Sequence, residues 1–586
     1  MTTTKQYDFL NRLTQISSAP GGAGLLPYTY AYNYNAANQR TRNTFSDGSH
    51  WSYQYDWLGQ VTNGGRYWSD GTPVAGQQYN YLFDTIGNRT KTWTGGDTNG
   101  ANLRPAVYSI NSLNQITRRD VPGTNDVIGA ALVGTNVTVN GVAADRKAEY
   151  FHGVVGTNNA SQPFWLTSTI IGDNTSLAGH LYVAKEPEQF QYDLDGNLTG
   201  DGRWIYTWDG ENRLIGMTVT TSAGPLYQLT FAYDWQGRRI QKVSVTNGVT
   251  IATCNFLYDG WNLEAEMGSS GTLVRSYVWG ADLSGSPQGA GGVGGLLETR
   301  YYGATTTNAF AAFDGNGNVS ALVNAANGTV VANYEYGPFG EVIRNSGPMA
   351  KVNPIRFSTK YQDDESDLLY YGCRYYKPST GTWPNRDSLE EKGGNNLYGF
   401  ADNNAITDID ADGRITVTTE SGNMFNVGCG AFWYKFLFTL DNPPATSGFI
   451  VQRVDISKKW YDCGSRTLHR YSFTFWELGL VKKSDNPLGV GDDSRDGPFD
   501  NSFGTYQVVT QIRWYPWSVV GIGVILWPGN EYTKGHATST QPSWWGPWTG
   551  GLINGELPAS RSVFAVWNCC CGTSSSTVGV FPPLTQ

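Results

Sequence analysis

The chain has 586 residues, with 50 acidic and 41 basic side chains and a net charge of −9 at pH 7. Aromatic residues make up 14% of the chain and charged residues 16%, against about 25% charged residues in an average domain. This composition excludes intrinsic disorder and argues against a coiled coil or a helical bundle. The 72 glycines favour short β-strands joined by tight turns, and the length requires several hydrophobic cores or a repeat architecture.

The sequence shows no sign of a nucleic-acid-binding tract, a transmembrane helix or a secretory signal. There is no basic tract, so the repeat-bearing part of the chain is not expected to bind nucleic acid. The longest apolar run, Val519 to Trp527, is shorter than the ~20 residues of a membrane helix, so no transmembrane segment is expected. The N-terminal residues lack the apolar stretch of a secretory signal. This leaves two readings, export by another route or a reading frame that begins inside a longer chain.

The seven cysteines include no spaced pair of the kind that binds zinc, so we expect neither a metal nor a cofactor. Cys254 and Cys373 are isolated, and the other five fall in the last third of the chain. A disulfide among those C-terminal cysteines and inert thiols remain alternatives.

A short unit recurs along the chain: an aromatic residue, Asp, two variable residues, Gly or Asn, and then alternating apolar residues. The pattern predicts an Asx-turn, in which the Asp carboxylate accepts a backbone N–H just downstream and the Gly or Asn takes a positive φ. The alternation that follows predicts a strand, and stacking on its neighbours stabilises each unit. The clearest copies are Tyr55-Asp56, Phe83-Asp84, Tyr192-Asp193, Trp208-Asp209, Tyr233-Asp234 and Phe313-Asp314.

Two stretches interrupt the repeats. Residues 120–187 alternate like strands but lack the unit, which predicts an inserted β-sandwich-like module, with His152 and His180 at its surface. Gly280 to Gly295 is rich in glycine, but no G-K-[ST] and no helical pattern follow it. We therefore expect a flexible loop rather than a phosphate-binding loop.

The repeats resemble the YD repeats of the RHS (rearrangement hot spot) family. The stretch from Asn353 to Arg414 is similar to that family's C-terminal core motif. The matching positions are Arg356, Asp364, Glu365, Leu369, Tyr370, Tyr371, Arg374, Tyr375, Tyr376, Pro378, Gly381, Asp387, Asn396, Leu397, Tyr398, Asn403, Asn404, Asp410 and Gly413.

The resemblance implies an all-β fold, in which a long sheet spirals into a shell with the core motif as a plug at one end. It also implies that the shell encloses the polypeptide that follows and releases it by aspartyl-type self-cleavage. Asp387 and Asp410 match the family's catalytic positions, Arg374 matches its arginine, and the cut falls at or within two residues of the Arg414–Ile415 bond. Two nearby carboxylates suit this chemistry because they do not both ionise readily, so that one acts as acid and one as base.

Four positions depart from the family pattern. Ser388, Ala405 and Ala411 stand where the family has proline, and Arg414 stands where it has leucine. Because proline fixes φ near −65°, we expect the loss of the three prolines to loosen the loop that holds the scissile bond. Working self-cleavage and a purely structural plug therefore both remain open.

The sequence predicts five regions: repeats over 1–119, the inserted module over 120–187, repeats over 188–352, the core motif over 353–414, and a separate β-rich domain over 415–586. The last region is rich in tryptophan and has as many basic as acidic residues (12 of each). In the family it occupies the position of a toxic payload. A catalytic toxin and a non-catalytic binding domain are both open for it.

Two functions follow. In the first, an RHS-type shell carries its own C-terminal domain as guest, with a capping or secretion-apparatus partner chain. In the second, an extracellular YD-repeat scaffold displays β-domains for adhesion, with a carbohydrate or cell-surface ligand. Exposed aromatic residues would form the binding surface in this second case. Both place the protein outside the cell or at its surface.

Overall fold

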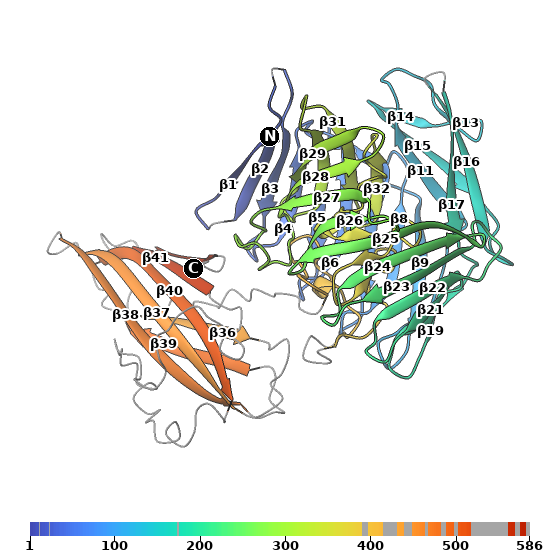
Figure 1. The fold of residues 1–586 in the computed structure, drawn as a ribbon. Helices are drawn as coiled ribbons and strands as arrows, with labels where there is room; N and C mark the ends of the chain where they lie inside the picture. The colour runs from blue at the N-terminus through green and yellow to red at the C-terminus, as the bar shows by residue number, and fades with distance from the viewer. Residues whose placement is uncertain are drawn as a thin grey trace. The chain divides into compact units, whose positions relative to one another are not determined.

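The computed structural model describes residues 1–10, 12–22, 24–172, 175–388 and 396–413, together with seven strands between residues 431 and 581. It divides into two compact units. The first comprises residues 1–6, 13–283 and 290–417, and the second comprises residues 7–12, 284–289 and 418–586. The described structure is built almost wholly from antiparallel β-strands (Figure 1), which confirms the predicted all-β class.

Two large antiparallel sheets make up most of the first unit, and we call them together the wall. One has eleven strands in the order β1 to β10 and then β18, and the other has fourteen in the order β19 to β32. The family likeness implied one long sheet, but the strand order breaks at Phe190, between β18 and β19.

The strands of the first sheet are β1 (Thr2–Tyr7), β2 (Leu13–Ala19), β3 (Tyr28–Tyr34), β4 (Arg40–Phe45), β5 (His50–Tyr55), β6 (Val61–Tyr67), β7 (Pro73–Phe83), β8 (Arg89–Gly95), β9 (Leu103–Ile110), β10 (Ile116–Arg119) and β18 (Glu188–Gln189). Those of the second are β19 (Gln191–Tyr192), β20 (Leu198–Gly200), β21 (Trp204–Trp208), β22 (Leu214–Val219), β23 (Tyr227–Tyr233), β24 (Arg239–Thr246), β25 (Val249–Asp259), β26 (Asn262–Met267), β27 (Leu273–Trp279), β28 (Leu296–Tyr302), β29 (Thr306–Phe313), β30 (Val319–Asn324), β31 (Val330–Tyr336) and β32 (Val342–Ser346).

The repeat unit forms the turn that its sequence predicts. In a representative copy, Asp56 Oδ1 accepts hydrogen bonds from the N–H groups of Leu58 and Gln60, both at 2.9 Å. Gly59 between them has φ +89°. Asn38, Asn114 and Asn212 take the same position in other copies, at φ between +58° and +64°. The Asx-turn and the positive φ are thus confirmed.

A hydrogen bond also links successive repeats. The aromatic residue of one unit donates a hydrogen bond from its ring O–H or N–H to a backbone carbonyl of the preceding unit. That carbonyl belongs to the first or second residue of the strand that follows the preceding turn. Tyr55 Oη, for example, donates to Arg40 O at 2.6 Å. The same bond joins Tyr34 to Leu13, Trp208 to Leu198, Tyr233 to Leu214, Tyr258 to Arg239, Trp279 to Leu263 and Tyr336 to Val319.

Residues 120–187 form two small antiparallel sheets, one of three strands (β11-β15-β14) and one of four (β13-β12-β16-β17), around a small apolar cluster. His152 was expected at the surface, but it is only 6% exposed. Its Nε2 lies 2.8 Å from Asp126 Oδ1, because β15 pairs with β11 and brings the two side chains together. The strands are β11 (Thr124–Ala130), β12 (Thr138–Val139), β13 (Val142–Ala143), β14 (Asp145–Lys147), β15 (Tyr150–Gly156), β16 (Phe164–Gly172) and β17 (Thr175–Val183).

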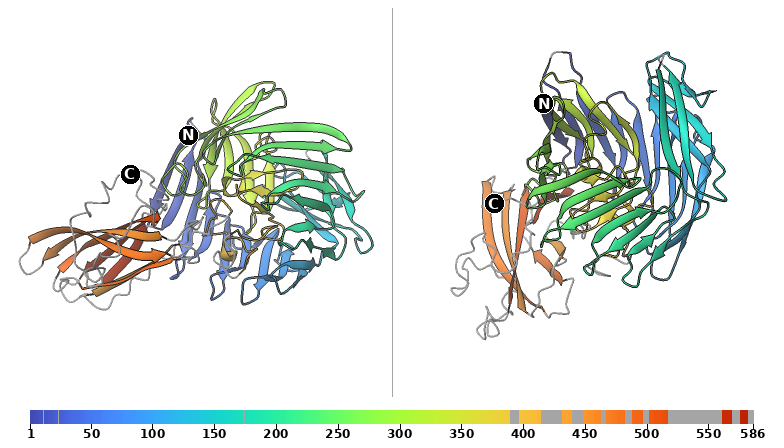
Figure 2. Two further views of the ribbon diagram at one scale, coloured as in Figure 1. Left: turned by 60° about the horizontal axis from the view of Figure 1, so that its bottom comes forward. Right: turned by 45° about the vertical axis from the view of Figure 1, so that its right-hand side comes forward.

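Residues 353–413, which we call the core segment, lie within the curve of the wall (Figure 2). The segment contains a three-stranded sheet and short helical turns, and its Trp383, Tyr376 and Phe400 are fully buried. Both sheets of the wall hold it: Asn403 Nδ2 donates to Gly87 O at 2.7 Å, and Tyr398 Oη donates to Gly196 O at 2.8 Å. Its elements are η1 (Phe357–Thr359), β33 (Tyr361–Gln362), β34 (Leu369–Tyr370), β35 (Tyr375–Tyr376) and η3 (Ala401–Asn403).

The second unit contains two antiparallel sheets, one of two strands (β36-β39) and one of five (β38-β37-β40-β41-β42). Its strands are β36 (Ala431–Phe438), β37 (Gly448–Asp462), β38 (Thr467–Val481), β39 (Leu488–Asp496), β40 (Ser502–Pro516), β41 (Arg561–Asn568) and β42 (Ser575–Phe581). Within the described ranges, no helix has the length and apolar character needed to cross a membrane.

Candidate functional site

The three residues singled out in the core segment meet at one place. Arg374 precedes β35, Asp387 follows the buried Trp383, and Asp410 lies near the end of the segment. Arg374 Nη2 lies 2.6 Å from Asp387 Oδ2 and 3.9 Å from Asp410 Oδ2. One guanidinium nitrogen therefore bridges two carboxylates that are 23 residues apart in sequence.

Asp410 is the more deeply buried of the two carboxylates, with 1% of its surface exposed. Its Oδ1 accepts hydrogen bonds from the backbone N–H groups of Asp412 at 3.1 Å and Gly413 at 2.7 Å. Burial raises the pKa of Asp410 to about 7, although the charge of Arg374 and the two backbone donors act in the opposite direction. A large share of Asp410 is therefore protonated near neutral pH.

Arg374 is also buried and makes two side-chain contacts besides those with the carboxylates. Its Nε donates to Gly413 O, and its guanidinium carbon lies 4.2 Å from the centre of the Trp383 ring. Burial lowers the pKa of Arg374, while Asp387 and Asp410 act to raise it. Its Nη1 has no hydrogen-bond partner among the described residues. This donor is available to an oxygen that develops negative charge nearby.

Lys360 belongs to the same cluster, and the sequence did not single it out. Its Nζ donates to Ala411 O at 2.6 Å and to Gly291 O at 2.8 Å. In the sequence Lys360 is an ordinary lysine whose spacing to its neighbours forms no motif. Its burial, with that of the whole stretch Arg356–Lys360, becomes visible only in the structure. Gly291 comes from the stretch expected to be a flexible loop, yet Ala290 and Val293 beside it are buried. That expectation is wrong for this half of the loop, because Lys360 and the core segment pack against it.

The predicted cleavage bond, Arg414–Ile415, lies outside the described residues. Two of the departures from the family pattern lie in the described core segment beside intact contacts: Ala405 is buried, Ala411 is held through its carbonyl by Lys360, and both carboxylates contact Arg374. Among the described residues, no three His, Cys, Asp or Glu side chains gather in a way that could hold a metal ion.

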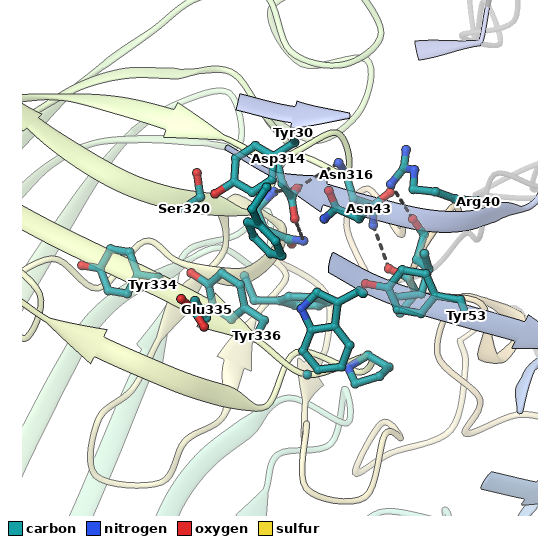
Figure 3. A pocket seen from close by; sticks show the side chains of 18 residues that line it. Tyr30, Arg40, Asn43, Tyr53, Asp314, Asn316, Ser320, Tyr334, Glu335 and Tyr336 are labelled. Carbon is teal, nitrogen blue, oxygen red and sulfur yellow. Dashed lines mark hydrogen bonds between the residues drawn. The ribbon is translucent and has the colours of Figure 1, made fainter. Parts of the chain in front are cut away.

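A small pocket lies elsewhere in the first unit, between the first strands of one sheet and the last strands of the other (Figure 3). Asp314 is its central carboxylate, but Asn316 and Asn318 donate to that carboxylate within its own YD turn at 2.9 and 3.0 Å. Arg40 Nη1, also in the lining, donates to Ile406 O at 2.8 Å. These polar groups support the architecture and do not form a reaction centre.

Comparisons with known proteins agree with this fold. A family model described as Teneurin YD-shell matches residues 305–406. The tRNA3(Ser)-specific nuclease WapA of Bacillus spizizenii is 30% identical over 238 residues, which are 39% of this chain and 9% of that protein. Double-stranded DNA deaminase toxin A of Burkholderia cenocepacia is 31% identical over 245 residues, 39% of this chain and 17% of that protein.

The probable deoxyribonuclease RhsA of Dickeya dadantii is 23% identical over 418 residues, 69% of this chain and 25% of that protein. The chain thus corresponds to a quarter or less of the length of each of these three relatives. Among solved structures, the crystal structure of TcdB2-TccC3-Cdc42 aligns with 70% of this chain and 20% of that chain, at 16% identity and a TM-score of 0.35. The YD turns and the core segment agree with these sequence matches, and together they make the chain similar to RHS-type YD-repeat proteins, whose shells occur in polymorphic toxin-like proteins.

Proposed function

We propose that the chain is an RHS-type carrier that releases its own residues 415–586 by aspartyl self-cleavage. The observation that carries the proposal is the buried bridge in which Arg374 Nη2 lies 2.6 Å from Asp387 and 3.9 Å from Asp410. It joins one carboxylate held by an ion pair to a second, buried carboxylate whose pKa is raised to about 7, so that this second group is protonated in a large share of the molecules near neutral pH. This is the division of roles that peptide hydrolysis by two carboxylates requires.

In the proposed reaction, Asp387 accepts a proton from a water molecule as the water oxygen attacks the scissile carbonyl carbon. Asp410 donates its proton to the carbonyl oxygen, and the Arg374 Nη1 donor stabilises charge that develops there. The tetrahedral intermediate then returns a proton from its hydroxyl to Asp410 as the C–N bond breaks. The leaving amine takes the proton held by Asp387, so both carboxylates return to their starting states.

We place the cut at the Arg414–Ile415 bond. Support comes from the last described residues, because Arg374 Nε binds the carbonyl of Gly413, one residue before Arg414. The backbone at Gly413 is thus held beside the two carboxylates, one residue before the candidate bond.

The proposal extends to the fate of the released domain. Relatives of this chain are named as nucleases and as a deaminase toxin, and we infer that residues 415–586 are a toxin-type cargo that is secreted or injected.

We also infer a capping partner chain. In the described part of the first sheet β1 is one of the two edge strands, and all its residues are exposed. An exposed edge is able to pair with a strand of another chain.

The test is the intact mass of the purified full-length chain as wild type, Asp387→Asn and Asp410→Asn. We expect the wild type to split at Arg414–Ile415, faster below pH 7 than above it because Asp410 must be protonated, and both variants to stay whole. Asp364→Asn is the matched control, since Asp364 is a largely exposed carboxylate of the same segment, and this variant should split like the wild type. A wild type that remains whole across this pH range would instead favour the non-catalytic display scaffold.

A further inference from the structure

The backbone just before the candidate cleavage bond is held through three consecutive carbonyl groups. Ala411 O accepts from Lys360 Nζ at 2.6 Å, Asp412 O accepts from the backbone N–H of Cys373 at 2.9 Å, and Gly413 O accepts from Arg374 Nε. The N–H groups of Asp412 and Gly413 donate to the Asp410 carboxylate. The position of the Asp410 carboxylate therefore depends on the path of the backbone from 411 to 413.

Lys360 is the side chain that links this backbone to the wall. It follows η1, is 7% exposed, and its Nζ binds Ala411 O and Gly291 O together. A Cβ on Gly291 would lie 1.8 Å from Ala411 O, so the two backbones touch at this point and only a glycine fits. The ammonium group thus joins two carbonyls from segments more than a hundred residues apart in sequence.

Lys360 also balances charge at the site. The titratable groups that face it are Asp410 and Asp412 of the core segment, Asp282 from the glycine-rich stretch, and Cys373. Burial lowers the pKa of Lys360 to about 8, so the ammonium form still predominates at pH 7. A positive charge near Asp410 favours the ionised form of that carboxyl, and its removal raises the pKa of Asp410.

We propose that Lys360 is a positioning residue for self-cleavage, which fixes Asp410 and the chain up to Gly413 by clamping Ala411 against Gly291. The inference rests on the proposed function, since it assigns a further residue to the same reaction. It requires no contact between Lys360 and the scissile bond.

The first experiment follows the rate of self-cleavage by intact mass, from pH 5 to 9, in the full-length chain. We expect Lys360→Met to cleave about 10- to 100-fold more slowly than the wild type, because small displacements of a catalytic group have effects of this size. We also expect the decline of its rate at high pH to move to higher pH, because the pKa of Asp410 rises. Lys377→Met is the matched control: Lys377 is a half-buried lysine of the same segment that pairs with Asp201 of the wall. That variant should leave the pH of the decline unchanged.

The second experiment does not depend on cleavage. In the Asp387→Asn chain, amide hydrogen exchange at Asp412 and Gly413 should be faster with Lys360→Met and unchanged with Lys377→Met. If the wild type cleaves and Lys360→Met matches it in rate and pH profile, the role of Lys360 is refuted and the proposed function stands. If the wild type does not cleave, the proposed function itself fails, and Lys360 is left without a reaction to position.

Discussion

Burial of Asp410 changes its protonation behaviour, and the pH dependence of stability tests this directly. Its pKa is raised from 3.8 to about 7 by burial, so between these pH values the folded chain binds more protons at this site than the unfolded chain does. Stability must then fall as the pH rises through this window, and the loss is complete above the folded pKa. A neutral side chain of the same shape removes this dependence.

We therefore predict a difference between Asp387→Asn and the double variant Asp387→Asn/Asp410→Asn, in both of which self-cleavage is blocked. Between pH 4 and pH 8 the single variant should lose stability relative to the double variant, by on the order of a few kcal/mol for a shift of this size. Urea unfolding at each pH measures the difference. Parallel stability curves for the two proteins would show that Asp410 is ionised in the folded chain across this range.

At the scale of the element, the YD turn is specified by residues within five positions of one another. The Asp side chain satisfies two backbone N–H groups, and the fourth residue after the aromatic takes a left-handed conformation, as Gly237 does at φ +83°. The ring hydrogen bond to the preceding repeat then sets the spacing of neighbouring turns. These local rules explain why a chain with so few charged residues forms a regular wall.

A comparison of Gly237 with Gly210 distinguishes the cost of a left-handed backbone from the cost of steric crowding at a glycine. A Cβ on Gly237 or on Gly210 would have no heavy atom within 4 Å, but only Gly237 has φ in the left-handed region. Gly237→Ala should destabilise the fold by about 1–2 kcal/mol. Gly210→Ala should be neutral or slightly stabilising, because alanine reduces the freedom of the unfolded chain. Midpoints of urea unfolding compare the two variants, and equal midpoints would mean that the turn relaxes to accept the side chain at Gly237.

The sequence allowed such local features to be predicted, and the reason lies in their short range. Asp56 and Gly59 act within one turn, so their roles follow from spacing alone. The meeting of Arg374, Asp387 and Asp410 did not follow from spacing, and it was expected only through the resemblance to RHS proteins. Burial of His152 depends on pairing between strands about twenty residues apart, and the contact of Lys360 with Gly291 joins distant segments. No periodicity in the sequence encodes such contacts.

At the scale of the whole first unit, the core segment is held to the wall by buried charges. Asp363 is 0% exposed, and its carboxylate accepts hydrogen bonds from Arg239 Nη1 at 2.6 Å and from Lys242 Nζ at 2.9 Å. Both donors belong to β24. Burial acts to raise the pKa of Asp363, but the two cations outweigh it and the pKa is lowered. The guanidinium of Arg239 also lies over the rings of Tyr361 and Tyr370. Asp363 thus compensates Arg239 and shares the compensation of Lys242 with Glu365, whose Oε2 lies 2.9 Å from Lys242 Nζ.

Loss of that aspartate should release the core segment. Asp363→Ala leaves Arg239 buried without its carboxylate partner, while Lys242 keeps Glu365, and breaking a buried pair such as that of Arg239 costs about 3–5 kcal/mol. We expect a lower midpoint of urea unfolding and rapid proteolysis within residues 353–413. Asp364→Ala is the matched control, because the Asp364 side chain is 54% exposed and its partner Arg356 keeps its hydrogen bonds to Asn353, Gln362 and Ala350. If both variants resist protease equally, the apolar contacts of Trp383, Tyr376 and Phe400 alone hold the core segment in the wall, and the charged anchor is dispensable.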